Sequence, residues 1–216
     1  MNFAIIAQQL VSGMGSSLMI FVLTLLFSMP LGLLVAFGRM SKIKPLQAVI
    51  KVFIAILRGT PLMLQLLVVN FAPYYLFRIS LPRWYRFAAI IIGFSINYAA
   101  YFAEIYRSGI ESIPKGQYEA ASVLGYNKNQ TFFRIIFPQM VKRVLPPVTN
   151  EVITLVKDTS LAFVLAYEEM FTVAKQIASA RTSIMPLFVA GVFYFIFNAV
   201  VAFAMERIEK KLSYCH

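Results

Sequence analysis

The first 38 residues carry no charged side chain, and this run restricts the fold more than any other feature of the sequence. A helix of that length would measure about 57 Å, whereas the hydrocarbon core of a bilayer is only about 30 Å thick. Apart from Met14, the segment Ser12–Ser17 consists of glycine and serine, and we expect the helix to break there. The sequence therefore predicts a first membrane span over Met14–Gly38, preceded by a short interfacial or external segment over residues 1–13.

The rest of the 216-residue chain is similarly apolar, with 60% hydrophobic and 13% charged residues. Soluble domains average about 45–50% apolar and about 25% charged residues, so a water-soluble globule is excluded. The apolar runs predict an all-α membrane protein with five transmembrane helices, and no room is left for a separate catalytic domain. Residues 1–216 then form a single transmembrane domain. Its predicted spans cover residues 14–38, 48–77, 87–106, 144 to beyond 158, and 182–205, with a cytoplasmic loop region over 107–143 and a cytoplasmic tail over 206–216.

Lysine and arginine together number 20, against 9 acidic residues. With the tail in the cytoplasm, 13 of the basic residues lie inside and 5 outside, which predicts an external N-terminus and a cytoplasmic C-terminus. No basic run interleaves with aromatic residues as in nucleic-acid sites, so no nucleic-acid partner is expected. The only cysteine is Cys215 and the only histidine is His216, so neither a metal site nor a catalytic triad is expected.

The longest polar loop contains a predicted short helix over Gln117–Leu124. Pro114 punctuates its start, and Gly125 suits the position after its last turn. Asn127 and Gln130 resemble a capping box for the next helix. We expect Glu119 to begin the short helix, and Ala120 and Ala121 to give it a small-residue face that another surface can approach. A docking element and a solvated connector both fit this composition.

Three motifs carry a resemblance to a known family. Glu119-Ala120-Ala121, followed by Gly125 and Pro138, resembles the EAA loop of ABC importer permeases, although Phe137 stands where the family has leucine. The segments 58–61 (Arg-Gly-Thr-Pro) and 157–161 (Lys-Asp-Thr-Ser-Leu) resemble the polar amino-acid subfamily of histidine, glutamine and arginine permeases. The resemblance spans nearly the whole chain. It implies a type I ABC importer permease fold with a short cytoplasmic coupling helix that contacts the ATPase through Tyr118, Glu119, Ala120, Ala121 and Gly125.

The resemblance also implies partners. It predicts a cytoplasmic ABC ATPase dimer that binds ATP and Mg, a second permease subunit that is identical or related, and an extracytoplasmic substrate-binding protein. The chain has no GxxxxGK[ST] phosphate loop, so it binds no cofactor itself and is not the ATP-hydrolysing subunit. The expected location is the cytoplasmic (inner) membrane of a prokaryote.

Ionisable residues at bilayer depth cost about 2.5–3.5 kcal/mol each, so they usually face a cavity or a partner. Asn97, Tyr101 and Glu104 are spaced i, i+4, i+7 and share one helical face. Glu104 either pairs with Arg107 or Arg58 as a structural contact or meets a cationic group of a ligand. No role is predicted for Glu151, Glu168 or Glu169, but the pair at 168–169 is expected near the outer surface.

Asp158 lies beside Lys157. This pair is either self-neutralising, or marks the end of a helix, or leaves Asp158 pointing into a translocation path opposite Glu104. Two carboxylates converging there would favour a basic amino acid. Pro61 either breaks its helix at the midplane and exposes backbone groups to substrate, or simply kinks it. The predicted substrate-binding residues are Arg58, Thr60, Asn97, Tyr101, Glu104, Asp158 and Ser160.

These features predict an ATP-driven importer permease for polar, basic amino acids of the arginine, lysine or histidine type, working by alternating access. An ATPase-independent secondary transporter or channel is the alternative. Five spans and the absence of a recognisable inverted repeat count weakly against that alternative. A membrane-embedded enzyme would need a nucleophile with a base, and no catalytic residue is predicted.

Overall fold

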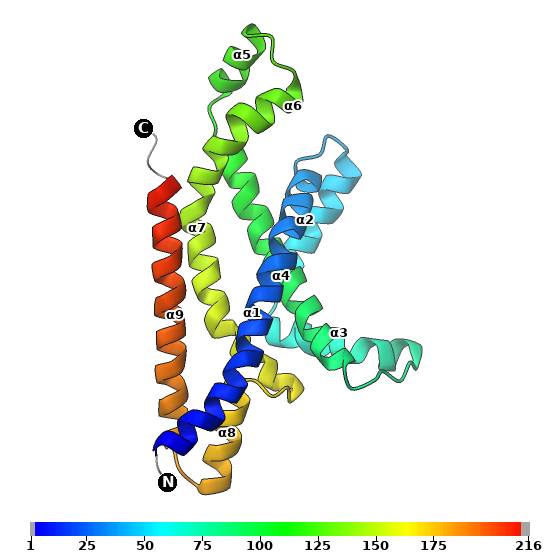
Figure 1. Cartoon of the computed structure of the whole chain (residues 1–216). Helices are drawn as coiled ribbons and strands as arrows, with labels where there is room; N and C mark the ends of the chain where they lie inside the picture. Colours follow the sequence, from blue (N-terminus) through cyan, green and yellow to red (C-terminus); the bar gives the residue numbers. More distant parts are fainter. Residues whose placement is uncertain (1–2, 213–216) are drawn as a thin grey trace.

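A computed structural model describes residues 3–212, which form helices and no strand (Figure 1). The long elements are α1 (Phe3–Arg39), α2 (Lys44–Gly59), α3 (Leu62–Phe77), α4 (Tyr85–Glu111), α7 (Phe137–Asp158) and α9 (Met185–Leu212). The shorter ones are α5 (Lys115–Val123), α6 (Lys128–Thr131), the π-helix η1 (Phe132–Ile136), the 3₁₀-helix η2 (Thr159–Leu165) and α8 (Met170–Arg181). The predicted tail residues Cys215 and His216 lie outside the described residues.

Helix α4 is the centre of the bundle, because α1, α2, α3 and α7 all pack against it. Its side chains Phe94, Tyr98 and Phe102 are almost completely buried. The contact with α1 is close: a Cβ added to Gly32 would lie 2.8 Å from the Cβ of Phe102. On the other side of the bundle α9 packs along α7, and α8 fills the corner between α1 and α9 (Figure 1).

The predicted break at Ser12–Ser17 is wrong, because α1 runs without interruption from Phe3 to Arg39. The small residues serve helix packing instead. A Cβ at Gly13 would lie 2.8 Å from the Cα of Met170, so only glycine allows α8 to approach this closely. The hydroxyl of Ser17 is buried and donates a hydrogen bond to the Glu169 carboxylate over 3.4 Å. Glycine and serine here mark a helix contact rather than a turn.

The chain turns sharply between α2 and α3, whose axes differ by 111°. Thr60 and Pro61 are extended, and Pro61 precedes the first residue of α3. The segment at residues 58–61 is therefore a complete break between two helices, and the alternative of a simple proline kink is wrong. Figure 1 shows α3 projecting sideways from the bundle, whereas α2 runs along it.

Three described helices are long and apolar enough to cross a membrane: Ile6–Arg39, Tyr85–Glu111 and Met185–Leu212. The bent pair α2 and α3 could form a fourth span. The predicted fourth span corresponds to α7, but this helix carries Lys142, Arg143, Glu151, Lys157 and Asp158 and does not reach the same mean hydropathy. The structure thus has membrane-spanning helices, but it does not confirm the predicted number of five.

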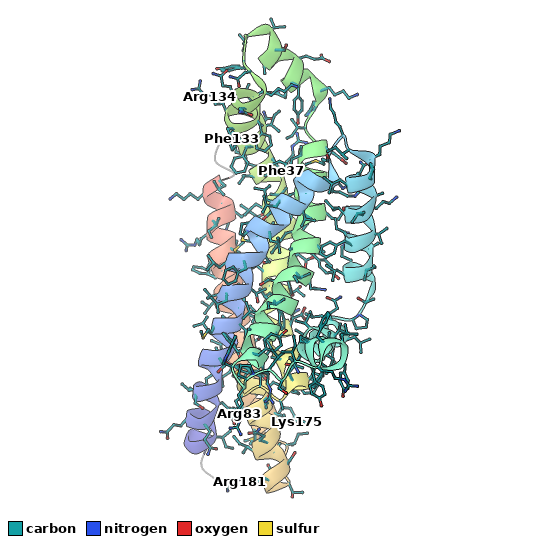
Figure 2. The ribbon with its side chains drawn as sticks, turned by 90° about the vertical axis from the view of Figure 1, so that its right-hand side faces the viewer. Phe37, Arg83, Phe133, Arg134, Lys175 and Arg181 are labelled. Carbon is teal, nitrogen blue, oxygen red and sulfur yellow. The ribbon has the colours of Figure 1, made fainter. Side chains whose placement is uncertain are left out.

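The two ends of the bundle carry different parts of the sequence. The beginning of α1 and all of α8 lie at one end, whereas α5, α6 and the end of α9 lie at the other (Figure 1). Figure 2 shows Arg83, Lys175 and Arg181 at the α8 end and Arg134 at the α5 end. The basic residues predicted to be outside and inside are thus separated in space, while the orientation in a membrane stays a prediction.

We expect Gly13→Val to destabilise the protein, because the new side chain would overlap the backbone of α8 at Met170. Overpacking of this kind costs about 1–3 kcal/mol. Gly15→Val is the matched control, since nothing lies within 4 Å of a Cβ at Gly15. Thermal unfolding in detergent measures the difference. Equal melting temperatures for the two variants would contradict the close contact of α1 with α8.

Candidate functional site

The break between α2 and α3 is held by a network of amide groups. The Gln65 side chain donates hydrogen bonds to the carbonyl oxygens of Leu57 (2.8 Å) and Thr60 (3.1 Å), which the break leaves without helical partners. Asn97 on α4 donates to the same Leu57 carbonyl over 3.1 Å and to the Gln65 Oε1 atom over 3.0 Å. The Thr60 hydroxyl donates to the carbonyl of Ile56 over 2.8 Å. The network satisfies the freed carbonyls and joins the break to the central helix.

A cavity of about 260 Å³ lies next to this network, between α3, α4 and α7. We call it the central cavity; its lining residues are Thr60, Leu62, Asn97, Tyr98, Tyr101, Glu151, Thr154 and Asp158. Four of the seven predicted substrate-binding residues therefore come together here: Thr60, Asn97, Tyr101 and Asp158. Asn97 and Tyr101 project into it from the same face of α4, as their spacing predicts.

Two carboxylates, those of Glu151 and Asp158, line the central cavity. No lysine or arginine is among its lining residues. Asp158, at the end of α7, accepts a hydrogen bond from the hydroxyl of Tyr98 over 2.8 Å. Glu151 lies seven residues earlier on α7 and faces the same space. Within residues 3–212 neither carboxylate forms an ion pair. Lys157 and Asp158 therefore form no ion pair, and Asp158 is the last residue of α7, as the helix-end alternative predicts. Both carboxylates face the cavity.

A second cavity of about 470 Å³ adjoins the first and extends toward the α5 end. We call it the flanking cavity, and it shares Tyr101 and Glu151 with the central cavity. Arg58, at the end of α2, lines it and places its guanidinium carbon 5.1 Å from the centre of the Tyr101 ring. This geometry is that of a cation–π contact. Arg107 and Arg143 also line this cavity, so its charge is mixed.

Glu104 also lines the flanking cavity, but its carboxylate is already paired. It contacts the Arg107 guanidinium at 2.7 Å and the Nε atom of Arg39 at 3.7 Å. The predicted arrangement of Glu104 opposite Asp158 is therefore wrong, since Glu151 is the carboxylate that shares a cavity with Asp158. The alternative in which Glu104 makes a structural contact holds for Arg107 and Arg39, and Arg58 stacks on Tyr101 instead.

Ser160 lines neither cavity. Its hydroxyl donates to the carbonyl of Lys157 over 2.8 Å within η2, so it is used in local backbone capping. Glu151, Tyr98 and Gln65 were missed by the sequence reasoning. Glu151 precedes Asp158 by seven residues and so lies on the same face of α7, and this spacing could have revealed it.

At the far end of the molecule, strong capping signals end α5 and begin the next helix, α6, whereas the start of α5 at Pro114 has no side-chain cap. Gly125 has φ of +77°, and the N–H groups of Gly125 and Tyr126 bond to the carbonyls of Ser122 and Ala121. This is the Schellman arrangement that ends a helix. The predicted capping box is also present, since Asn127 and Gln130 bond reciprocally side chain to backbone. These hydrogen bonds thus fix the C-terminal end of α5 relative to the start of α6.

The exposed surface of α5 differs from the predicted small-residue face. Ala121 is fully buried against the chain itself, so only Ala120 stays accessible. The helix begins at Lys115, which puts Glu119 in its second turn rather than at its start. Instead, Val123 and Leu124 are 88% and 73% exposed, and Tyr118 is also exposed.

A buried carboxylate also joins three helices at the opposite end. Glu169 is completely buried at the start of α8, and its expected place near the outer side of the membrane stays a prediction. It accepts hydrogen bonds from the N–H groups of Phe171 and Thr172, from the Thr172 hydroxyl and from the Tyr194 hydroxyl on α9, over 2.6–2.9 Å. Helix capping and side-chain donors together satisfy the charge, so this group is structural.

Comparison with known proteins gives a family for this chain. The family model described as "Binding-protein-dependent transport system inner membrane component" matches residues 28–214. The L-cystine transport system permease protein TcyB of Bacillus subtilis (strain 168) is 37% identical over 194 residues, which is 89% of this chain and 81% of that protein. The arginine transport system permease protein ArtQ of the same organism is 30% identical over 205 residues, covering 94% of this chain and 92% of that protein.

A solved structure supports the fold. The crystal structure of an amino acid ABC transporter with histidines superposes with a TM-score of 0.86 at 29% sequence identity. The match covers 98% of this chain and 99% of that chain. The fold class predicted from the sequence, an all-α membrane protein of the type I ABC importer permease kind, is therefore confirmed.

We expect Gln65→Met to destabilise the break between α2 and α3 and to reduce transport. The variant keeps a side chain of similar length but removes the Thr60 carbonyl's donor, one of the two donors to the Leu57 carbonyl and the acceptor of the Asn97 amide, and an unsatisfied buried polar group costs about 1–3 kcal/mol. Gln176→Met, at an exposed position of α8, is the control. Thermal unfolding and solute uptake measure both variants. If Gln65→Met behaves like Gln176→Met, the network does not hold the break.

Proposed function

This chain belongs to the family of binding-protein-dependent transport system inner membrane components, and we propose that it is the permease subunit of an importer for basic amino acids. The central cavity carries this proposal, because two carboxylates face one small space and neither forms an ion pair within residues 3–212, although Arg58 lines the flanking cavity that Glu151 also borders. Every α-amino acid has an ammonium group, and a basic one has a second cationic group. Glu151 and Asp158 supply one carboxylate for each.

Arg58 determines which way round the solute binds in the site. It lines the flanking cavity together with Tyr101 and Glu151, whereas Asp158 lines only the central cavity, so Arg58 can bind the α-carboxylate of the solute while Glu151 and Asp158 bind its cations. Attraction between unit charges 4 Å apart is worth about 4 kcal/mol near a protein surface, before the cost of desolvation. A neutral amino acid would use only one of the two carboxylates. The named relatives transport cystine and arginine, so the family accommodates different side chains.

The chain itself is a non-catalytic membrane component, as its family implies. We propose that energy comes from a cytoplasmic ABC ATPase dimer that binds ATP and Mg and docks on α5. The exposed apolar residues Val123 and Leu124, together with Tyr118, support this docking surface. An extracytoplasmic binding protein would deliver the solute at the α8 end. A second permease subunit, identical or related, would cover the apolar side chains that α2 and α3 expose.

We expect ATP to drive uptake of arginine by the complete transporter. The assay reconstitutes this chain with its ATPase and binding protein in vesicles and measures labelled arginine with ATP, without ATP, and with an ion gradient alone. Uptake that follows the ion gradient and ignores ATP would overturn the proposal in favour of a secondary transporter.

We expect Glu151→Gln to weaken arginine binding about tenfold, or about 1.4 kcal/mol, with a much smaller effect on glutamine. The reason is that the variant removes one of the two charges facing the cation. Binding of labelled arginine and glutamine to the transporter in nanodiscs, without binding protein, measures the chain's own preference. Glu168→Gln, at an exposed position, is the control. An equal loss for both solutes would remove the argument for basic substrates.

We expect Gly125→Val to uncouple ATP hydrolysis from transport. A β-branched residue in the left-handed conformation costs about 1–2 kcal/mol or more, so the end of α5 would rearrange. Gly116→Ala is the matched control, because position 116 lies inside the helix with nothing within 4 Å of a Cβ. The readouts are arginine uptake and the stimulation of ATPase activity. Normal values of both in Gly125→Val would count against a docking role for α5.

A further inference from the structure

Helix α2 carries a regularly spaced row of cations. Lys44, Lys51 and Arg58 follow one another at intervals of seven residues, with Gln47 between the first two. At 3.6 residues per turn these four positions fall within about 60° around the helix axis. We call them, with Ala55 between Lys51 and Arg58, the polar stripe.

The remaining surface of α2 is apolar. Ile54 is buried against the bundle, whereas Val49, Val52 and Ile56 are more than half exposed on the side away from the polar stripe. Helix α2 thus has three sectors: one packed on its neighbours, one suited to lipid or another apolar surface, and the polar stripe. The cations are therefore confined to one sector and not scattered around the helix.

The depth of the polar stripe requires an explanation. Lys51 lies about 10.5 Å along the helix from Lys44, and Arg58 about 21 Å, in a segment that forms part of a broken membrane span. The side chains of all three are exposed, and within residues 3–212 none of them forms an ion pair. A cation facing lipid at depth costs about 2.5–3.5 kcal/mol, so the stripe must face water or anions.

Arg58 shows which way the polar stripe faces. It lines the flanking cavity, which follows α4 from Tyr101 to Ser112, a length of about 16 Å. Helix α2 packs on α4 and runs in the opposite direction, so the stripe and the cavity extend together from the level of Tyr101 toward the α5 end (Figure 1). Arg107 and Arg143 line the same cavity. Cations thus border this route on α2, α4 and α7.

We propose that the polar stripe lines a water-filled exit route and attracts the carboxylate group of the transported amino acid on its way from the central cavity to the α5 end. This inference rests on the proposed function, since it requires a solute with a carboxylate. The cations are too far apart to bind one carboxylate together. They act in sequence on the carboxylate end of the solute, while the carboxylates of Glu104 and Glu151, which line the same cavity, offset the repulsion between these cations and the basic end of the solute.

The experiment places single cysteines on α2 in the complete transporter, with Cys215, the chain's only cysteine, replaced by serine. Ala55→Cys reports on the polar stripe between Lys51 and Arg58, and Ile56→Cys, the next residue on the apolar side, is the control at the same depth. Anionic and cationic methanethiosulfonate reagents are compared in nanodiscs, and each rate is divided by that of free cysteine. ATP-driven arginine uptake of each variant is measured in parallel.

We expect Ala55→Cys to react at least about tenfold faster than Ile56→Cys, because thiols in lipid do not ionise. The anionic reagent should be favoured about threefold or more at Ala55→Cys. This preference should fall in Lys51→Gln and persist in Lys51→Arg. Arginine should slow the anionic reagent, whereas agmatine, which has the same guanidinium but no carboxylate, should not.

Equal reactivity at positions 55 and 56, or none at either, would place the polar stripe in lipid or against phosphate headgroups and overturn the proposal. An unchanged preference in Lys51→Gln would overturn the role of the cations, and equal protection by arginine and agmatine would overturn the role of the carboxylate. These outcomes differ from a failure of the proposed function, which shows as an absence of ATP-driven arginine uptake before any cysteine is introduced.

Discussion

A bilayer offers no water to a backbone carbonyl, so a helix can be interrupted there only where the protein supplies replacement donors. The break between α2 and α3 meets this requirement through Gln65 and Asn97, whose amide groups bond to the carbonyls of Leu57 and Thr60. Asn97 also lines the central cavity. The same hydrogen bonds therefore join the break to the central helix and position a side chain that lines the site.

Signals that act over a few residues were predictable from the sequence. Pro61 marks the break, Gly125 ends α5, and Asn127 with Gln130 caps the next helix, because each depends only on backbone geometry within one turn. The shared face of Asn97 and Tyr101 follows from helical periodicity alone. The fold class was predictable too, because the apolar runs and the three spaced motifs cover almost the whole chain.

The failures concern contacts between residues far apart in the sequence. Ser12–Ser17 looked like a turn, but Gly13 and Ser17 meet α8, which lies more than 150 residues away. Glu104 looked free for a ligand, but Arg39 approaches it from the end of α1. Ala121 looked accessible, but the hairpin of α5 and η1 buries it. In each case composition described the residue correctly, and only the packing of distant helices decided which neighbour it meets.

The position of α5 suggests how a displacement of this helix can reach the residues that line the two cavities. It lies between α4 and α7 in the sequence. Gln139 on α7 bonds to Gln117 on α5 over 3.2 Å, and Arg143 on α7 bonds to Ser112 at the end of α4, so α7 has polar contacts with both. Helices α4 and α7 carry most of the residues that line the two cavities. A rigid displacement of α5 would therefore move Tyr101 and Glu151 relative to Arg58 on α2. Because Tyr101 and Glu151 line both cavities, a small shift between these helices can decide which cavity is open to the solute.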